Sequence, residues 1–219
     1  MTRAVIFDCD GVVVDSEALT FDLLAEDLTT YGLELPRAAL EAAFLGGTMR
    51  GIWQKARDLG AGLPDDWVER FYIRLYAWLA GGTPLVPGIL GVLDALDAAG
   101  VPYAMGSNGS DEKMQITMGQ HPGLLDRFAG RMFSGQTLGA PKPAPTLFLH
   151  CAAVLQVNPA QCVVIEDSPT GARAARAARM RCLGYAPHGG TALAETGAEV
   201  FRDMAALPGL LGLQGGTRG

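Results

Sequence analysis

An apolar run that leads directly into two acids is the feature of this chain that most constrains its fold. Residues Ala4 to Phe7 (AVIF) are followed by Asp8 and Asp10, with one residue between them. A short apolar run of this kind predicts a buried strand. A carboxylate beside a core costs on the order of several kcal/mol unless a cation or hydrogen-bond donors replace its water. The sequence therefore predicts a polar site at the end of this strand.

Further short apolar runs recur along the chain, and most of them precede a helical pattern. The runs cover residues 103–106, 132–133, 163–165 and 182–185. The pair Ser168-Pro169 predicts a helix start, with a capping hydroxyl before a proline. Such alternation is typical of βα units, whose parallel sheet is covered by helices on both faces. We expect an α/β fold with a doubly wound parallel sheet.

One long stretch breaks this alternation. Residues 15–83 show helical spacing of large apolar side chains, as at Trp67, Phe71, Leu75 and Trp78, and no convincing strand. All three tryptophans of the chain fall in this stretch. We interpret residues 15–83 as an inserted helical cap domain, and residues 1–14 with 84–219 as the main domain. The tryptophans fit a small core of the insertion itself or, alternatively, an aromatic wall over a ligand.

Charge and cysteine usage limit the classes of partner. The formal net charge is −6, which offers no basic surface for nucleic acid or an anionic membrane. The four cysteines lack a CxxC or Cys/His pattern, so we expect reduced thiols and neither a zinc site nor a disulfide framework. The start of the chain has no leader-like apolar run. These features favour a cytoplasmic protein, with a monomer as the default expectation.

Side chains that are suited to catalysis or ligand binding follow four of the predicted strands. In chain order they are Asp8, Asp10, Ser107, Asn108, Lys142, Glu166 and Asp167. Ligands of parallel sheets bind beyond the carboxyl ends of the strands, so these side chains are expected to converge. Four clustered carboxylates repel one another, and a hard cation such as Mg²⁺ compensates them. The lysine and the hydroxyl suit an anionic group such as a phosphoryl group.

Each of these features also has a simpler interpretation. The DCDG segment can form a tight turn. Glu166 and Asp167 can merely place negative charge at a helix N-terminus. Lys142 can be a solvated loop residue. The agreement between spacing and strand ends favours one joint site.

Four segments resemble the ordered motifs of the haloacid dehalogenase (HAD) superfamily phosphatases. They are FDCDGVVVDSE, SNGS from Ser107, KPAP from Lys142 and VIEDSPTGARAA from Val164. The similarity is strongest to the β-phosphoglucomutase-like branch, and SNGSDEKMQITMG with RMFSG is similar to bacterial 6-phosphogluconate phosphatases. The resemblance implies a Mg²⁺-dependent phosphatase that acts on a small phosphorylated metabolite, such as a sugar phosphate or 6-phosphogluconate, through an aspartyl phosphate.

The same resemblance implies a role for each motif residue. Asp8 is expected to be the nucleophile. Asp10 is expected to protonate the leaving alcohol and then to activate the hydrolytic water. The implied phosphate-binding residues are Ser107, Asn108 and Lys142. The implied Mg²⁺ ligands are the Asp8 carboxylate, the Asp10 main-chain carbonyl and Asp167, with Glu166 as direct or water-mediated support.

Three other functions compete with a phosphatase. The dehalogenases of the superfamily lack the second aspartate, so Asp10 argues against carbon–halogen cleavage. A sugar-phosphate mutase would share every catalytic residue, but mutases of this branch tend to carry a histidine where SEALTF has Thr20. A receiver-like phosphoacceptor module uses similar residues, although the long insertion argues against a compact receiver.

The segment LGGTMRGI, residues 45–52, is a candidate specificity loop. Gly47 and Arg50 match a Gly-x-x-Arg pattern that mutases of the related branch carry in their caps. A guanidinium there could bind a second anionic group of the substrate. The alternative is a solvated helix arginine.

Overall fold

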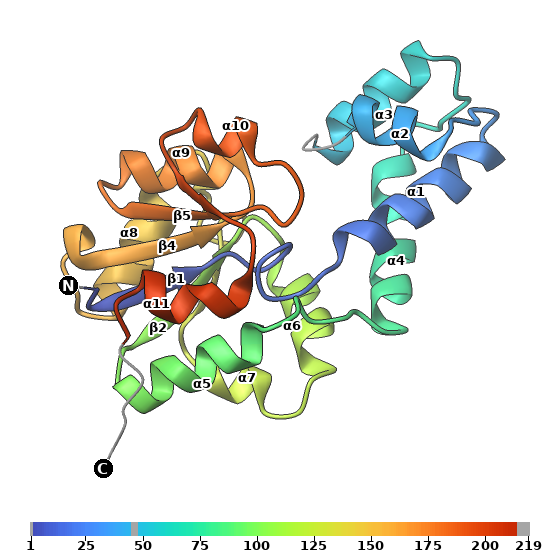
Figure 1. Cartoon of the computed structure of the whole chain (residues 1–219). Coiled ribbons are helices and arrows are strands. Elements are labelled where there is room, and N and C mark those ends of the chain that lie inside the picture. Colours follow the sequence, from blue (N-terminus) through green and yellow to red (C-terminus); the bar gives the residue numbers. More distant parts are fainter. Residues whose placement is uncertain (1, 45–47, 214–219) are drawn as a thin grey trace. The chain divides into compact units, whose positions relative to one another are not determined.

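The computed structural model describes residues 2–44 and 48–213. The chain forms two compact units, residues Met1–Asp15 with Pro84–Gly219, and residues Ser16–Thr83. Figure 1 shows the first unit as a sheet between helices and the second as a group of helices. The strands carry the residues of interest, so the first unit is described first.

The first unit is built on a six-stranded parallel sheet with the order β3-β2-β1-β4-β5-β6. Its strands are β1 (Ala4–Phe7), β2 (Tyr103–Ser107), β3 (Met132–Ser134), β4 (Cys162–Glu166), β5 (Arg181–Tyr185) and β6 (Glu199–Phe201). The chain builds outward from β1 to β3 and then returns to place β4 on the other side of β1. The strand order therefore reverses between β1 and β4. The predicted α/β fold is confirmed.

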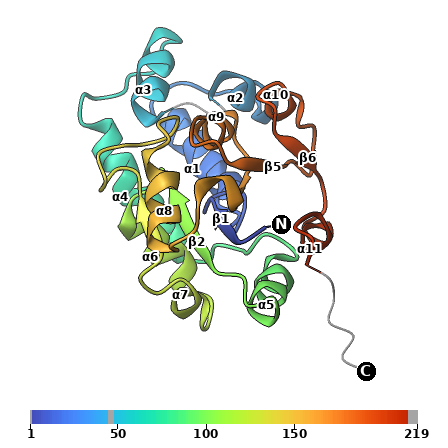
Figure 2. The ribbon, with the colours of Figure 1, turned by 90° about the vertical axis from the view of Figure 1, so that its left-hand side faces the viewer.

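Helices cover both faces of this sheet (Figures 1 and 2). Side chains alternate along β1: Val5 and Phe7 join one hydrophobic core, whereas Ala4 and Ile6 join the other. The first core is shared with α5 (Ile89–Ala99), α6 (Asp111–Gly119), α7 (Leu124–Arg127) and α11 (Leu207–Leu210). The second core is shared with α8 (Thr146–Val154), α9 (Pro169–Ala177) and α10 (Thr191–Ala194). Two short 3₁₀ turns, Pro159–Gln161 and Met204–Ala206, complete the unit.

The second unit consists of helices in its described part. These are α1 (Glu17–Thr30), α2 (Arg37–Phe44), α3 (Met49–Asp58) and α4 (Trp67–Ala80). Trp67 is fully buried, stacks on Phe71 with ring centroids 5.0 Å apart and donates its Nε1–H to Asp27. Trp53 is also buried and donates to the Pro64 carbonyl. These two tryptophans belong to the unit's own core.

The sequence pattern placed Trp78 on the buried stripe of the same helix, and this expectation is wrong. The buried residues of α4 recur every four positions as Trp67, Phe71, Leu75 and Leu79. Trp78 stands one position off this stripe and is 45% exposed. Spacing of three or four residues fits both positions, and only packing separates them.

The two chain segments that connect the units pair with each other inside the first unit. Asp15 donates its N–H to the Pro84 carbonyl over 2.8 Å, and Val86 donates to the Val13 carbonyl over 3.0 Å. This short antiparallel contact fixes the loop that follows β1, where Asp8 and Asp10 lie.

Two sequence-based expectations concern the thiols and the membrane. All four cysteines are free and buried, in agreement with the absence of a disulfide pattern. Within the described residues, no helix combines the length and the apolar character that crossing a bilayer requires.

Candidate active site

The candidate site lies at the carboxyl ends of β1, β2 and β4, where the strand order reverses. Asp8 follows β1 directly, and its N–H continues the ladder by donating to the Ile165 carbonyl over 2.9 Å. Ser107 and Glu166 are the last residues of β2 and β4. Open parallel sheets bind ligands at such a point, because two neighbouring loops diverge there and leave a crevice.

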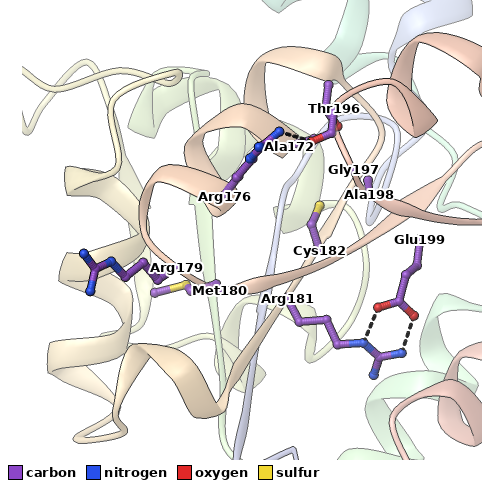
Figure 3. Close-up of a pocket in the computed structure, with 10 residues that line it drawn as sticks. All are labelled: Ala172, Arg176, Arg179, Met180, Arg181, Cys182, Thr196, Gly197, Ala198 and Glu199. Atoms are coloured by element: carbon purple, nitrogen blue, oxygen red, sulfur yellow. Dashed lines mark hydrogen bonds and ion pairs between the residues drawn. The ribbon is translucent and has the colours of Figure 1, made fainter.

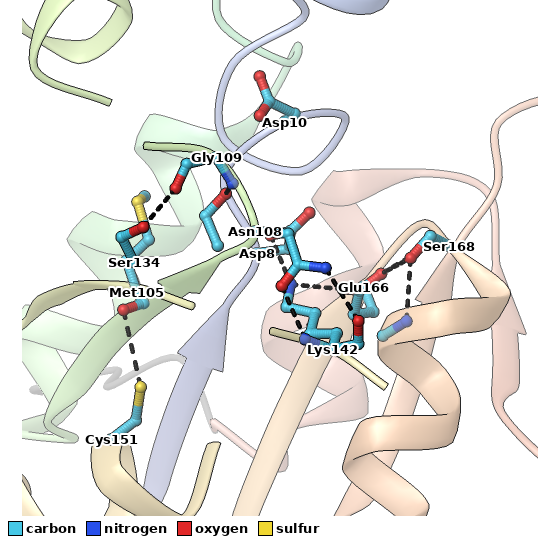
Figure 4. A network of polar contacts seen from close by, with 12 residues as sticks. Asp8, Asp10, Met105, Asn108, Gly109, Ser134, Lys142, Cys151, Glu166 and Ser168 are labelled. Atoms are coloured by element: carbon cyan, nitrogen blue, oxygen red, sulfur yellow. Dashed lines mark hydrogen bonds and ion pairs between the residues drawn. The ribbon is translucent and has the colours of Figure 1, made fainter. Parts of the chain in front are cut away.

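A buried ion cluster forms the centre of this site (Figure 4). The Lys142 ammonium lies 2.6 Å from Asp8 Oδ1 and 2.7 Å from Glu166 Oε1. The exposed fractions of these side chains are 3% for Lys142, 11% for Asp8 and 0% for Glu166. One cation thus faces two carboxylates in a region that water scarcely reaches.

The excess of negative charge shows in the pKa values. Burial, followed by the charges of Glu166 and Asp10, raises the pKa of Asp8 to about 7, although Lys142 opposes this rise. Burial alone would lower the pKa of Lys142, but Asp8 and Glu166 outweigh it, and the pKa of the ammonium is raised. The lysine is therefore firmly charged, and the carboxylates need more positive charge than it supplies.

Glu166 is the anchor of the cluster. Its Oε2 accepts hydrogen bonds from the Ser168 N–H and hydroxyl, each 2.8 Å long. The Ser168 Oγ in turn accepts from the Gly171 N–H and caps α9, as the sequence predicted. A Cβ at Gly171 would lie 1.7 Å from Glu166 Oε1, so only glycine leaves room for this carboxylate.

The Asn108 side chain binds the main chain of Lys142 and so holds the loop that carries Lys142 close to the end of β2. Its side-chain amide donates to the Lys142 carbonyl over 3.1 Å, and its Oδ1 accepts from the Lys142 N–H over 2.8 Å. Both ends of the amide therefore contact the lysine main chain. The neighbouring Ser107 is buried, and its Oγ accepts from the Gly109 N–H over 3.0 Å.

Three carboxylates lie close enough to share a cation. Asp8, Glu166 and Asp167 each offer an oxygen, and these atoms lie within 4.8 Å of one another. Gly11 has a φ of +77°, and a Cβ there would lie 2.1 Å from Asp167 Oδ2, so the loop after β1 approaches Asp167 closely. An all-oxygen, acidic set of this kind fits a hard divalent ion such as Mg²⁺.

The Asp10 carboxylate stands apart from this cluster (Figure 4). It pairs with Lys113, whose Nζ lies 2.8 Å from Asp10 Oδ1. Lys113 belongs to the first turn of α6, after the segment that ends β2. Sequence reasoning did not single out Lys113, although its place just behind the SNGS motif was a usable signal.

The proposed specificity loop belongs to the second unit. Arg50 lies in α3, is exposed, and holds its guanidinium carbon 4.3 Å from the ring centroid of Trp53. Gly47 lies outside the described residues. The stacking contact gives Arg50 a defined position within its own unit.

Comparison with known families decides the class of protein. Residues 2–179 match the family described as haloacid dehalogenase-like hydrolase. The chain is a haloacid dehalogenase-like hydrolase. The matched span contains every motif residue of the sheet domain, so the family resemblance that the four motifs indicated is confirmed.

Relatives of this HAD-like hydrolase include named phosphatases. It is 31% identical over 172 residues to the 6-phosphogluconate phosphatase of Escherichia coli, covering 78% of this chain and 76% of that protein. A solved HAD family hydrolase of Deinococcus radiodurans, with bound phosphate and sodium, superposes with a TM-score of 0.82 at 31% identity over 97% of each chain. The chain also matches the chloroplastic protein suppressor of quenching 1 of Arabidopsis thaliana, at 33% identity over 82% of its own length, but spans only 17% of that protein.

A hollow on the HAD-like hydrolase lies away from the candidate active-site residues (Figure 3). It has a volume of about 480 Å³ and lies beside the first residues of β5 and β6, at the opposite edge of the sheet. Its Arg181 is paired with Glu199 through two contacts of 2.8 and 2.6 Å, and Arg176 donates to the Thr196 carbonyl. The charges of Arg181 and Glu199 are thus paired with each other, and the hollow contains none of the candidate catalytic, phosphate-binding or metal-binding residues.

Proposed function

We propose that this protein is a Mg²⁺-dependent phosphatase that hydrolyses a small phosphate monoester through a phosphorylated Asp8. The observation that carries the proposal is the position of Asp8. It stands at the end of the central strand, at 2.6 Å from a buried ammonium, with Asp10 two residues further along the same loop. The named phosphatase among the relatives supports the same reaction class.

The first half of the reaction is a transfer to Asp8. A carboxylate oxygen of Asp8 attacks the phosphorus while the bond to the leaving alcohol breaks, and Asp10 supplies the proton that the alcohol takes. Lys142 and the Ser107 region bind the phosphoryl oxygens, and Asn108 positions Lys142 through its two main-chain hydrogen bonds. In the second half Asp10 takes a proton from water, which attacks the phosphorus and frees Asp8.

Asp8, Asp167 and the Asp10 main-chain carbonyl would hold the Mg²⁺ ion. When bound, the ion supplies positive charge to the phosphoryl oxygens. Glu166 already accepts hydrogen bonds on both oxygens, so we propose that it supports the site mainly by fixing Lys142. The pKa of Asp8, raised to about 7, fits a cluster that needs a further cation.

The proposed substrate is a phosphorylated sugar or sugar acid, such as 6-phosphogluconate. Lys142 and the metal would neutralise the transferred phosphoryl group, so Arg50 would be available for a second anionic group of the substrate. The named 6-phosphogluconate phosphatase, whose substrate carries such a group, supports this choice.

Phosphate release from a panel of phosphorylated sugars, sugar acids and nucleotides tests the proposal. We expect Mg²⁺-dependent release with a preference for one sugar-derived substrate, and Asp8→Asn should reduce turnover below a few per cent of wild type. If the wild-type protein only isomerises a sugar phosphate, it is a mutase. If it releases no phosphate from any substrate, p-nitrophenyl phosphate included, the proposed function is wrong.

A further inference from the structure

Lys113 is a largely buried cation outside the central ion cluster. Its side chain is 16% exposed, and its Nζ forms a 2.8 Å ion pair with Asp10 Oδ1. It is the third residue of α6 (Asp111–Gly119), so its charge lies in the first turn of a helix. The positive end of the helix dipole disfavours a cation there. The Asp10 carboxylate is the group that compensates it.

The backbone of Lys113 is held from two sides. Its N–H donates to Oγ of Ser110, which caps the helix, over 3.0 Å. Its carbonyl accepts from the Thr117 hydroxyl over 3.0 Å. A lysine with a fixed backbone and a partly buried stem loses much of its freedom before it meets a partner, so it can define the partner's position.

The ion pair packs against Gly109, in the loop after β2. A Cβ at Gly109 would lie 3.5 Å from Asp10 Oδ2, 3.6 Å from Lys113 Cδ and 3.2 Å from Ser107 Oγ. The Gly109 carbonyl also accepts a 2.7 Å hydrogen bond from Ser134, which ties this loop to β3. Gly109 and the Lys113 ammonium therefore both lie next to the Asp10 side chain.

We propose that Lys113 is a positioning residue that holds the Asp10 carboxyl group at the place where it exchanges protons with the leaving group and with water. The inference rests on the proposed phosphatase function and adds a residue from α6 to it. Lys113 itself transfers no proton and no phosphoryl group. Its ammonium contacts Asp10 through Oδ1.

The reaction shows where such positioning matters. Asp10 takes up a proton from solvent before the first step, and as the Asp8–phosphorus bond forms and the bond to the leaving oxygen breaks, this proton passes to that oxygen. Later a water oxygen attacks the phosphorus, its proton returns to Asp10, and the Asp8–phosphorus bond breaks. Proton transfer by a well-placed side chain contributes about 10²–10⁴-fold to the rate, and it is sensitive to small displacements.

Two substrates separate this role from a general structural one. An alkyl phosphate such as glycerol 2-phosphate has a leaving alkoxide that must be protonated. p-Nitrophenyl phosphate releases a stable phenolate that leaves without a proton. Formation of phospho-Asp8, which kcat/KM reports, therefore depends on the Asp10 position with the first substrate and hardly with the second.

The experiment compares Lys113→Met with wild type on both substrates at saturating Mg²⁺. We expect kcat/KM for glycerol 2-phosphate to fall about 10- to 100-fold and that for p-nitrophenyl phosphate to change by less than about threefold. kcat should fall with both, because both share the hydrolysis of phospho-Asp8. Lys113→Arg, which keeps the cation, should recover most of the loss. Gln115→Met, at an exposed position of the same helix, is the matched control and should change neither substrate.

Each outcome of this experiment has a defined consequence. Equal losses of kcat/KM on both substrates, or none on glycerol 2-phosphate, would overturn the positioning role of Lys113. If thermal melts show that Lys113→Met does not fold, the same comparison is made with Lys113→Arg against Lys113→Gln. A wild-type enzyme that releases phosphate from neither substrate would overturn the proposed function, and the inference with it.

Discussion

Replacement of Lys142 by methionine tests whether the central cluster is balanced by this one cation. The variant keeps the length of the apolar stem but leaves Asp8 and Glu166 without the ammonium that lies 2.6 and 2.7 Å from them. Removing one member of a buried ion pair costs about 3–5 kcal/mol, because the remaining charge stays out of water. This is a large part of a typical unfolding free energy of about 5–15 kcal/mol.

The loss of stability caused by Lys142→Met should increase as pH rises. The folded-state pKa of Asp8 is already raised to about 7, from 3.8, and loss of the lysine raises it further. The folded variant then binds more protons than the unfolded chain above pH 3.8, so its stability falls as pH rises through that range. The variant should therefore be penalised much more at pH 8 than at pH 5.

Urea unfolding in EDTA at pH 8 and at pH 5 measures the free energy of unfolding and its dependence on pH, and thermal melts give the melting temperature. We expect Lys142→Met to lose at least about 3 kcal/mol at pH 8, with a melting temperature lower by about 10 °C, and clearly less at pH 5. Lys55→Met is the matched control, since Lys55 is exposed and its ammonium contacts the Ala43 carbonyl and the Phe44 ring but, within the described residues, forms no ion pair with a carboxylate. A loss below about 1 kcal/mol at pH 8, or one that does not change with pH, would show that the Lys142 ammonium does not balance the charges of Asp8 and Glu166.

Three further predictions follow from the site. Mg²⁺ should stabilise the protein by up to about 2.7 kcal/mol at a hundredfold excess over Kd, and so raise its melting temperature. Asp167→Asn should remove most of this rise in melting temperature. An equal rise in the variant would contradict the metal site. Gly171→Ala should lower activity and reduce the free energy of unfolding by about 1–3 kcal/mol, because the added Cβ displaces Glu166. Gly91→Ala is the control and should be neutral or stabilising, because the Cβ added there meets no neighbouring atom within 4 Å. Arg50→Ala should raise KM for a phosphorylated sugar acid about tenfold while kcat/KM for p-nitrophenyl phosphate stays unchanged, and equal effects on both would show that Arg50 does not bind the leaving group.

Strand ends were the part of the fold that sequence predicted best. The strand AVIF is apolar along its whole length, and its neighbours β2 and β4 are apolar up to their last residue, because both faces of a parallel sheet are covered. β6 was not predicted, since the three residues Glu199–Phe201 carry one exposed acid and gain strand structure only by pairing with β5. Trp78 was misplaced because helical spacing alone tolerates an error of one position.

Within the site, residue types were predictable and contacts were not. The positions of Asp8, Lys142, Glu166 and Asp167 at neighbouring strand ends follow from parallel topology. Sequence could not reveal that Glu166 is fully engaged by Lys142 and Ser168, because these hydrogen bonds depend on how α9 packs on the sheet.

Two other partnerships were hidden for the same reason. The Asn108 amide binds the main chain of a loop 34 residues away. Lys113 reaches Asp10 from a helix, whereas the sequence-based search for the catalytic centre considered residues that follow strands.

Trapping the phosphorylated enzyme shows directly whether Asp8 is the nucleophile. Wild-type protein is mixed with Mg²⁺ and its best substrate, quenched in acid within the turnover time, digested, and examined by mass spectrometry. We expect one added phosphoryl group on the peptide that contains Asp8, sensitive to hydroxylamine and absent from Asp8→Asn. Rapid phosphate release without any modified peptide, or a phosphoryl group on a different residue, would contradict it.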